Sequence, residues 1–228
     1  MHSFRSDTMP AHNSMKKNTK QAEFWLGTFS KGYVSRNLFT PKQQDAEYKK
    51  TYGVTRSAMD TEFLKGIPKT ARILAVGANV GNILIGLQKL GYTNLYGIEL
   101  NPNVVELARK RAPGIHIILG NALDIPFKDS YFDLVFTSGV LIHIAPKNRS
   151  KAMAEIYRAT NKFIWGFEYY ADRSMEIAYR GARNVLWKAP FASLYRKAFP
   201  DLKIVRTKKV HWRADGNIDE MFLLKKAS

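Results

Sequence analysis

The sequence predicts an α/β fold in which helices cover both faces of a parallel sheet. From residue 66 onward, short apolar runs alternate with amphipathic segments, the pattern of repeated strand and helix units. Asn101 and Pro102 mark a helix start, because asparagine caps well and proline at the first helical position gives up an N–H that has no partner. The last two runs, residues 202–208 and 220–225, lack an intervening helix and predict an antiparallel hairpin at the sheet edge.

The other elements follow in order along the chain. Residues 1–20 show no hydrophobic periodicity, so we expect a disordered tail. Residues 21–65 carry aromatic and aliphatic side chains at helical intervals, with breaks at Pro41 and Gly53, and predict a helical N-terminal segment. Residues 66–228 hold the sheet, and the whole chain should form one compact domain. The predicted strands are residues 72–76, 94–98, 115–119, 132–137 and 162–167, and the predicted helices are residues 82–89, 102–111 and 149–160.

The composition excludes several classes of function. The chain has no cysteine, which excludes disulfides and thiolate chemistry, and its five histidines lack the spacing of metal ligands, so we expect no metal. No run reaches the roughly 18 apolar residues of a membrane span. The N-terminus lacks the apolar centre of a secretory signal. We therefore expect a cytoplasmic protein without a membrane span.

The net charge of +17 predicts attraction to anions such as nucleotides, acidic sugars or nucleic acid. Residues 162–213 hold twelve Lys or Arg against four Asp or Glu, interleaved with aromatic side chains. Basic and aromatic residues together are typical of nucleic-acid surfaces. A solvated basic face over an aromatic core explains the same pattern, so nucleic acid is an alternative partner that the sequence does not favour.

The stretch RILAVGANVGN, residues 72–82, predicts a ligand site. An apolar run leads into a glycine-bearing loop and then a helix, and ligands bind at this turn in such sheets. Gly77 and Gly81 let a ligand approach the backbone without a Cβ in the way. Asn79 stands where a dinucleotide fingerprint has its middle glycine, which argues against NAD and FAD. Glu99 ends the second predicted strand, where a carboxylate can accept both ribose hydroxyl protons.

Residues 121–123 follow the third predicted strand and complete a nucleoside site. The Asn121 amide can hydrogen-bond an adenine edge while Ala122 and Leu123 pack against the ring. Four motifs, in this order along the chain, resemble those of the class I S-adenosylmethionine-dependent methyltransferases: VGANVGN, YGIELNP, GNALDIPF and FDLVFTSGVLIHI. A narrower resemblance is to the pseudaminic acid biosynthesis-associated methylases. It rests on GANVGN, GVLIHI, FEYY and YRG, and on EFWLGTFSKGYVSRN and YGVTRSAM nearer the N-terminus.

The resemblance implies a Rossmann-like sheet of seven strands with an antiparallel last strand, and an N-terminal helical lid. It implies S-adenosyl-L-methionine as cofactor and S-adenosyl-L-homocysteine as product. Arg56 would then meet the methionine carboxylate. The implied cofactor-binding residues are Arg56, Gly77, Ala78, Asn79, Gly81, Asn82, Glu99, Leu100, Asn121, Ala122, Leu123, Ser138 and Gly139.

Two residues depart from the family pattern, which usually has an acid at the Ala75 position and Asp at the Asn121 position. Asn121 keeps a side-chain acceptor. The carboxylate missing at Ala75 would help to order the loop and the cationic amino-acid end of the cofactor. Losing one charge-assisted hydrogen bond costs about 1.5–3 kcal/mol, or roughly ten- to a hundredfold in affinity. Three explanations stay open: another residue compensates, the natural enzyme binds its cofactor loosely, or the alanine was engineered.

Methyl transfer from a sulfonium is an in-line displacement, so positioning dominates and a base is needed only where the acceptor loses a proton. His143, close after Ser138 and Gly139, is the first candidate base; alternatively, it packs a helical turn with its ring hydrogen-bonded inward. Glu168, after the fifth predicted strand, is the second candidate catalytic residue, as a base or as a partner of an acceptor hydroxyl.

The expected acceptor site holds Tyr33, Tyr169, Tyr170 and Arg180. The tyrosines stack on an acceptor ring or pack in the core. The Arg180 guanidinium suits a carboxylate or phosphate, or a structural salt bridge. We therefore expect a methyltransferase of sugar biosynthesis acting on a polar, anionic small molecule such as a sugar or nucleotide-sugar. The alternatives are an RNA or protein methyltransferase, favoured by the charge, and a non-catalytic S-adenosylmethionine-binding relative, favoured by Ala75.

Overall fold

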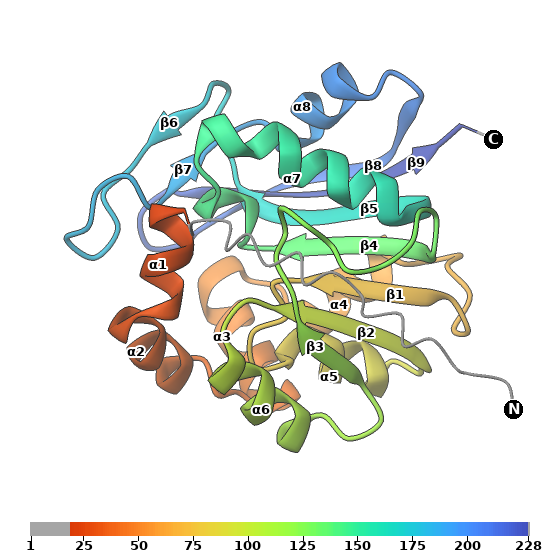
Figure 1. Ribbon diagram of the computed structural model, residues 1–228, viewed down its shortest axis with the longest axis horizontal. Coiled ribbons are helices and arrows are strands. Elements are labelled where there is room, and N and C mark those ends of the chain that lie inside the picture. Colours follow the sequence, from red (N-terminus) through yellow and green to blue (C-terminus); the bar gives the residue numbers. More distant parts are fainter. Residues whose placement is uncertain (1–18, 228) are drawn as a thin grey trace, which may run out of the picture.

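The computed structural model describes residues 19–227. The predicted tail, residues 1–20, lies outside the described residues except for Thr19 and Lys20. A seven-stranded sheet forms the centre of the molecule (Figure 1). In spatial order its strands are β3 (His116–Leu119), β2 (Asn94–Glu99), β1 (Arg72–Val76), β4 (Phe132–Ser138), β5 (Thr160–Tyr169), β9 (Ile218–Lys226) and β8 (Leu202–His211). Strands β1 to β5 are parallel and β9 is antiparallel to both neighbours, which confirms the predicted sheet and its hairpin.

Helices cover the two faces of the sheet because successive side chains of a strand point to opposite faces. On one face Ile73 and Ala75 of β1 join a core with α4 (Arg56–Phe63), α5 (Asn82–Lys89) and α6 (Pro102–Arg111). On the other face Leu74 and Val76 pack in a core with α7 (Pro146–Ala159) and α8 (Phe191–Ala198). The first parallel strand is therefore buried on both sides.

The N-terminal segment folds into α1 (Lys20–Leu26), α2 (Thr28–Arg36) and α3 (Pro41–Tyr52), followed by α4. Local signals define these helices. The Thr40 side chain and Gln43 form a reciprocal capping box at the start of α3, and Pro41 occupies its first turn rather than a break inside a helix. Gly53 ends α3 in the left-handed conformation.

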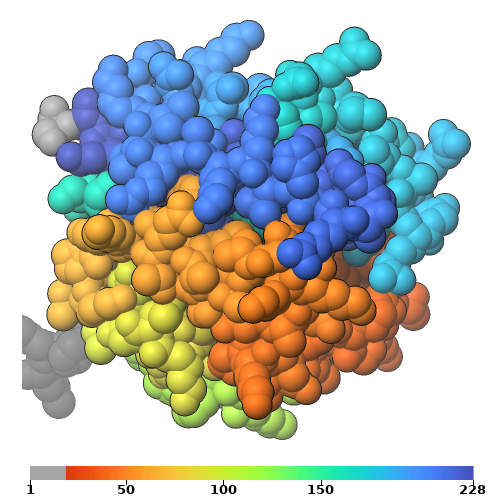
Figure 2. Space-filling view, turned by 180° about the vertical axis from the view of Figure 1, so that it is seen from behind, coloured from red at the N-terminus to blue at the C-terminus, as the bar shows by residue number. Residues whose placement is uncertain are grey.

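The N-terminal helices lie against two different parts of the sheet domain. Helices α1 and α2 lie at one end of the sheet, beside the hairpin of β6 (Met175–Glu176) and β7 (Trp187–Lys188) (Figure 1). On the back of the molecule, the orange segment of α3 and α4 fills the space between the blue strand β8 and the yellow helix α5 (Figure 2). Arg206 of β8 binds the end of α4 by donating to the carbonyl oxygens of Glu62 and Phe63 at 2.8 and 3.0 Å.

Several predicted boundaries were wrong by one to three residues. Helix α7 begins at Pro146, because proline suits the first turn, and it ends at Ala159. Strand β5 begins at Thr160 and extends to Tyr169, so Glu168 and Tyr169 belong to the strand that they were expected to follow. Strand β3 begins one residue later than predicted, and β2 and β4 end one residue later.

The sequence prediction also missed short elements, namely α8, the β6–β7 hairpin and a 3₁₀ turn at Leu141–His143. Two-residue strands and a single 3₁₀ turn are too short to show a hydrophobic period. Helix α8 has eight residues, and its apolar residues Phe191, Leu194 and Tyr195 stand at helical intervals that the prediction overlooked. In the basic and aromatic stretch, Trp165, Trp187, Phe191 and Tyr195 are buried, which favours the core interpretation of these aromatic residues. Within residues 19–227, no helix has both the length and the apolar character needed to cross a membrane.

Candidate functional site

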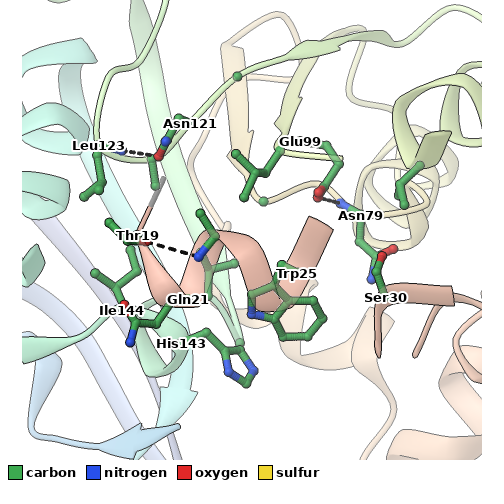
Figure 3. A pocket seen from close by; sticks show the side chains of 18 of the residues that line it. Thr19, Gln21, Trp25, Ser30, Asn79, Glu99, Asn121, Leu123, His143 and Ile144 are labelled. Atoms are coloured by element: carbon green, nitrogen blue, oxygen red, sulfur yellow. Dashed lines mark hydrogen bonds between the residues drawn. The ribbon is translucent and has the colours of Figure 1, made fainter. Parts of the chain in front are cut away.

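A cavity of about 1000 Å³ opens at the carboxyl ends of the parallel strands (Figure 3). Its walls come from the loops after β1, β2, β3 and β4, and α1 and α2 close it from the opposite side. It brings together most of the residues predicted from the sequence: Tyr33, Gly77, Asn79, Glu99, Leu100, Asn121, Ala122, Leu123, Ser138, Gly139 and His143.

A second cavity of about 720 Å³ lies beside the first, between the glycine loop and helices α2 and α3. It holds two further predicted residues, Ala78 and Asn82. Four residues line both cavities: Tyr33, Gly77, Asn79 and Ser138. The two cavities are therefore neighbouring parts of one cleft along the glycine loop.

The glycine loop needs glycine at both predicted positions. Gly77 has φ +70°, and a Cβ there would lie 2.7 Å from a methyl group of Val140. Gly81 has φ +83° and forms the N-cap of α5, with no side chain over the first N–H groups of that helix. The loop thus turns sharply from β1 into α5 and leaves its backbone next to the cleft.

Glu99 points from the end of β2 toward this loop (Figure 3). One carboxylate oxygen accepts from the backbone N–H of Asn79 at 2.9 Å, and the other accepts from the N–H of Asn101 at 3.0 Å. Burial raises the pKa of Glu99 because desolvation outweighs these N–H donors. The carboxylate is therefore fixed in orientation, and lone pairs remain on both oxygens for ligand hydroxyls.

Asn121 is also held by its own turn. Its side-chain oxygen accepts from the N–H of Leu123 at 2.9 Å, which folds residues 121–124 into a tight turn (Figure 3). The hydrogen bond to a ligand that we expected from this oxygen would have to share it with Leu123. The amide N–H groups of Asn121 can act as donors to a ring nitrogen.

His143 lines the first cavity from the 3₁₀ turn after β4. Its Nδ1 lies 2.8 Å from the carbonyl oxygen of Val185, so Nδ1 carries the proton and Nε2 is the basic nitrogen of the neutral ring. The ring packs against Trp25 and Tyr179, with centroids 4.7 and 5.5 Å away. Burial lowers the pKa of His143 to about 4. His143 is therefore hydrogen-bonded inward and also lines the cavity, and its role as a base stays a prediction.

This shift predicts an unusual titration. Because the folded-state pKa is below the ordinary value, His143 should stay neutral from pH 8 down to about 5, and stability should fall as pH drops from about 6.5 toward 4. Proton NMR of the imidazole signals checks this, with His143→Gln identifying the relevant signal. A midpoint at pH 6 or above would contradict the burial argument.

Glu168, the second candidate catalytic residue, lies behind the cavity rather than in it. It is 1% exposed and lines neither cavity. Its two oxygens accept from the backbone N–H groups of Val140 at 3.1 Å and Ile142 at 3.3 Å. Burial raises its pKa to about 7. Glu168 therefore stabilises the 3₁₀ turn that carries His143.

Arg56, expected at the methionine carboxylate, also stands behind the cleft. It is 2% exposed, pairs with Asp60 at 2.6 Å and lines neither cavity. It donates to the hydroxyl oxygens of Tyr48 at 3.1 Å and Ser138 at 3.0 Å. Both hydroxyl groups belong to residues that line the second cavity, so Arg56 positions that wall.

The other predicted acceptor residues lie outside both cavities. Tyr169 packs edge-on against Trp212 with ring centroids 5.7 Å apart, and Tyr170 donates to Asp172. Arg180 is exposed in a tight turn, residues 179–182, with a left-handed backbone. Of the expected acceptor residues, the structure brings Tyr33 into the cleft.

Several lining residues were missed by the sequence prediction. From the N-terminal helices come Gln21, Trp25 and Ser30 in the first cavity, and Gln44, Glu47 and Tyr48 in the second. The last three are spaced i, i+3 and i+4 and therefore share one face of α3. This spacing was visible in the sequence, but nothing in it showed that the polar face would turn toward the loop after β1.

Comparisons with known proteins agree with this geometry. Residues 74–162 match the family described as methyltransferase domain. Phosphoethanolamine N-methyltransferase of Plasmodium falciparum is 24% identical over 93 residues, which cover 40% of this chain and 35% of that protein. An uncharacterized methyltransferase of Oceanobacillus iheyensis is 26% identical over 141 residues, covering 59% of this chain and 65% of that protein.

Solved structures share the fold over a larger part of the chain. A Leishmania major S-adenosylmethionine-dependent methyltransferase has a TM-score of 0.68 at 18% identity, covering 90% of this chain and 82% of that one. A 1,6-didemethyltoxoflavin-N1-methyltransferase of Burkholderia thailandensis, solved with 1,6-didemethyltoxoflavin and S-adenosylhomocysteine, has a TM-score of 0.66 at 16% identity, covering 91% and 87%.

The sequence relatives are matched over only part of their length. The alignments span 35% to 42% of the Plasmodium falciparum enzyme, a Haemophilus influenzae protein and a Schizosaccharomyces pombe methyltransferase. Residues 74–162 thus match a methyltransferase domain, and the sheet and helices around them share the fold of solved S-adenosylmethionine-dependent methyltransferases.

Proposed function

We propose that the protein is an S-adenosylmethionine-dependent methyltransferase that acts on a polar small molecule. The charge of the cleft carries this proposal. Among the described residues that line the two cavities, the acidic side chains are Glu99 and Glu47, and no lysine or arginine is present. The whole chain, by contrast, has 36 Lys and Arg against 19 Asp and Glu. S-adenosylmethionine carries a sulfonium and an ammonium against one carboxylate, so an acidic cleft suits it.

The residues present fit the cofactor along the cleft. Glu99 would hold the ribose hydroxyls, and Asn121, Ala122 and Leu123 would surround the adenine. The glycine loop, open next to Gly77, would accommodate the amino-acid end in the second cavity. The first cavity also extends to His143, Ile144 and Asn148, beyond the residues assigned to the cofactor, which would leave space for an acceptor.

The bound cofactor would supply an electrophilic methyl group, and the protein would supply orientation and a base. His143 Nε2 would accept the proton that a hydroxyl or ammonium acceptor gives up, since the ring is neutral and its Nδ1 is committed to Val185. Trp25 and Tyr33, from α1 and α2, would exclude water from this part of the cleft. Glu168 would keep the His143 turn in place.

For the acceptor, we propose an anionic sugar or nucleotide-sugar, in line with the resemblance to the pseudaminic acid biosynthesis-associated methylases. Because no basic side chain lines the cavities, the negative charge of the acceptor would lie outside them; Arg180, exposed next to the Tyr179 ring that packs against His143, is the candidate cation. Glu168 and Tyr170 would then have no direct contact with it. One relative is named for the small molecule phosphoethanolamine, which supports a small-molecule acceptor over RNA but does not bear on the sugar.

Calorimetric titration tests the cofactor. Saturable binding of S-adenosylmethionine and S-adenosylhomocysteine at one site is expected, and no binding of either at millimolar concentration would refute the proposal. Transfer of a labelled methyl group to acidic sugars and their nucleotide conjugates tests the acceptor. Retention on immobilised RNA that falls steeply with salt would favour the RNA alternative instead.

A further inference from the structure

The second cavity surrounds the position where the family usually has an acid. Ala75 lines this cavity and is 2% exposed, and its methyl group can bind no cation. Leu84 and Phe136 line the cavity beside it. On the strand side, the cavity is therefore uncharged where a carboxylate would be expected.

A carboxylate reaches the same cavity from the opposite wall. Glu47 of α3 is the one ionisable acid or base of the described chain that lines it, besides the phenols of Tyr33 and Tyr48. Glu47 is exposed and makes no hydrogen bond or ion pair with another described residue. Its carboxylate is therefore available to a ligand.

Other acids nearby are already engaged. Asp60, on the neighbouring helix α4, is buried and pairs with Arg56 at 2.6 Å. Asp45, on α3, accepts from the N–H and the hydroxyl of Ser57 at 2.8 and 2.6 Å. Neither lines the cavity. Glu47 is thus the acid that can compensate for Ala75.

The geometry points to Glu47 as the residue that binds the α-ammonium group of S-adenosylmethionine. This inference rests on the proposed function, because it places the amino-acid end of the cofactor in the second cavity. An acid on α3 also has a different consequence from an acid on β1. Helix α3 would then carry part of the cofactor site, opposite the glycine loop that lines the same cavity.

Two ligands and two variants test this inference by calorimetry. The ligands are S-adenosylhomocysteine and its analogue that lacks only the amino group. Glu47→Gln should lower the affinity for S-adenosylhomocysteine about tenfold at low salt, as expected for one lost charge-assisted hydrogen bond. The affinity for the analogue should stay within about twofold of wild type. Glu23→Gln is the matched control, because Glu23 is an exposed acid of α1 that lines neither cavity.

The outcomes separate this inference from the proposed function. Equal binding of S-adenosylhomocysteine by wild type and Glu47→Gln would refute the role of Glu47 while leaving the cofactor assignment intact. An equal loss of affinity for both ligands would also refute this role of Glu47, since the loss would then not depend on the ammonium group. No binding of S-adenosylhomocysteine by wild type would refute the cofactor assignment itself. Because Glu47 is exposed, the variant should keep the wild-type circular dichroism spectrum.

Discussion

Replacing Glu99 by glutamine should weaken binding of S-adenosylhomocysteine at least about hundredfold. The carboxylate accepts from the N–H groups of Asn79 and Asn101, and it would also accept from two ribose hydroxyls. An amide presents one acceptor oxygen, so one backbone N–H would face an NH₂ group and one hydroxyl would lose its acceptor. The ligand would lose one charge-assisted hydrogen bond of about 1.5–3 kcal/mol, and its second hydrogen bond would become a neutral one, weaker by about 1 kcal/mol, which together give about a hundredfold or more. Isothermal titration calorimetry measures it.

The matched control is Glu106→Gln, which removes the same charge from an exposed position on α6. It should change affinity less than about twofold. A thermal melt reports on the fold separately, because one backbone N–H that Glu99 accepts from loses its acceptor in this variant. A loss below about fivefold for Glu99→Gln would mean that this carboxylate does not face the ribose.

Replacing Gly166 by alanine should destabilise the fold by about 3 kcal/mol, near the upper end of the usual cost of overpacking. A Cβ at this position of β5 would lie 2.1 Å from Cζ of Phe222, its partner on β9. Phe222 is fully buried and packs near Tyr195, with ring centroids 6.1 Å apart, so it has little room to move. For a chain of this size we expect a fall in Tm of about 6–12 °C in a thermal melt.

Gly86→Ala provides the comparison for this variant. No atom lies within 4 Å of a Cβ at Gly86, which is inside helix α5. The same substitution there should stabilise the protein by about 0.5–1 kcal/mol, because alanine favours the helix over glycine. A Tm for Gly166→Ala within about 2 °C of wild type would show that β5 and β9 can separate to admit the methyl group.

The central strands of the sheet could be predicted because they are buried on both faces. Arg72–Val76 reads as a continuous apolar run, and Asn82–Lys89 and Pro102–Arg111 begin at strong turn and capping signals, so their bounds were predicted correctly. Such signals are local. The hairpin was also recognisable, since two apolar runs without a helix between them must pair in opposite directions.

Only part of the cleft wall was predicted, because sequence signals are local. Gly77, Glu99 and Asn121 follow consecutive strands, and parallel strands bring their carboxyl ends together at one edge. Glu47 and Trp25 reach the cleft through the packing of α1 and α3 on the sheet domain, which depends on contacts between residues far apart in the chain. Arg56 and Glu168 were expected to touch a ligand, but their burial behind Ser138 and Val140 follows from tertiary packing that no local pattern encodes.

Asn101 begins α6 and also secures the N-terminal helices. Its side-chain oxygen accepts from the N–H of Asn103 at 3.1 Å, and its side-chain nitrogen donates to the carbonyl oxygen of Trp25 at 3.3 Å and the hydroxyl of Ser30 at 3.2 Å. Aspartate, serine and threonine cap helices comparably well, yet aspartate has no donor and the two hydroxyl side chains are shorter. The position therefore tolerates fewer residue types than an ordinary helix cap, because one amide side chain contacts three helices, α6, α1 and α2.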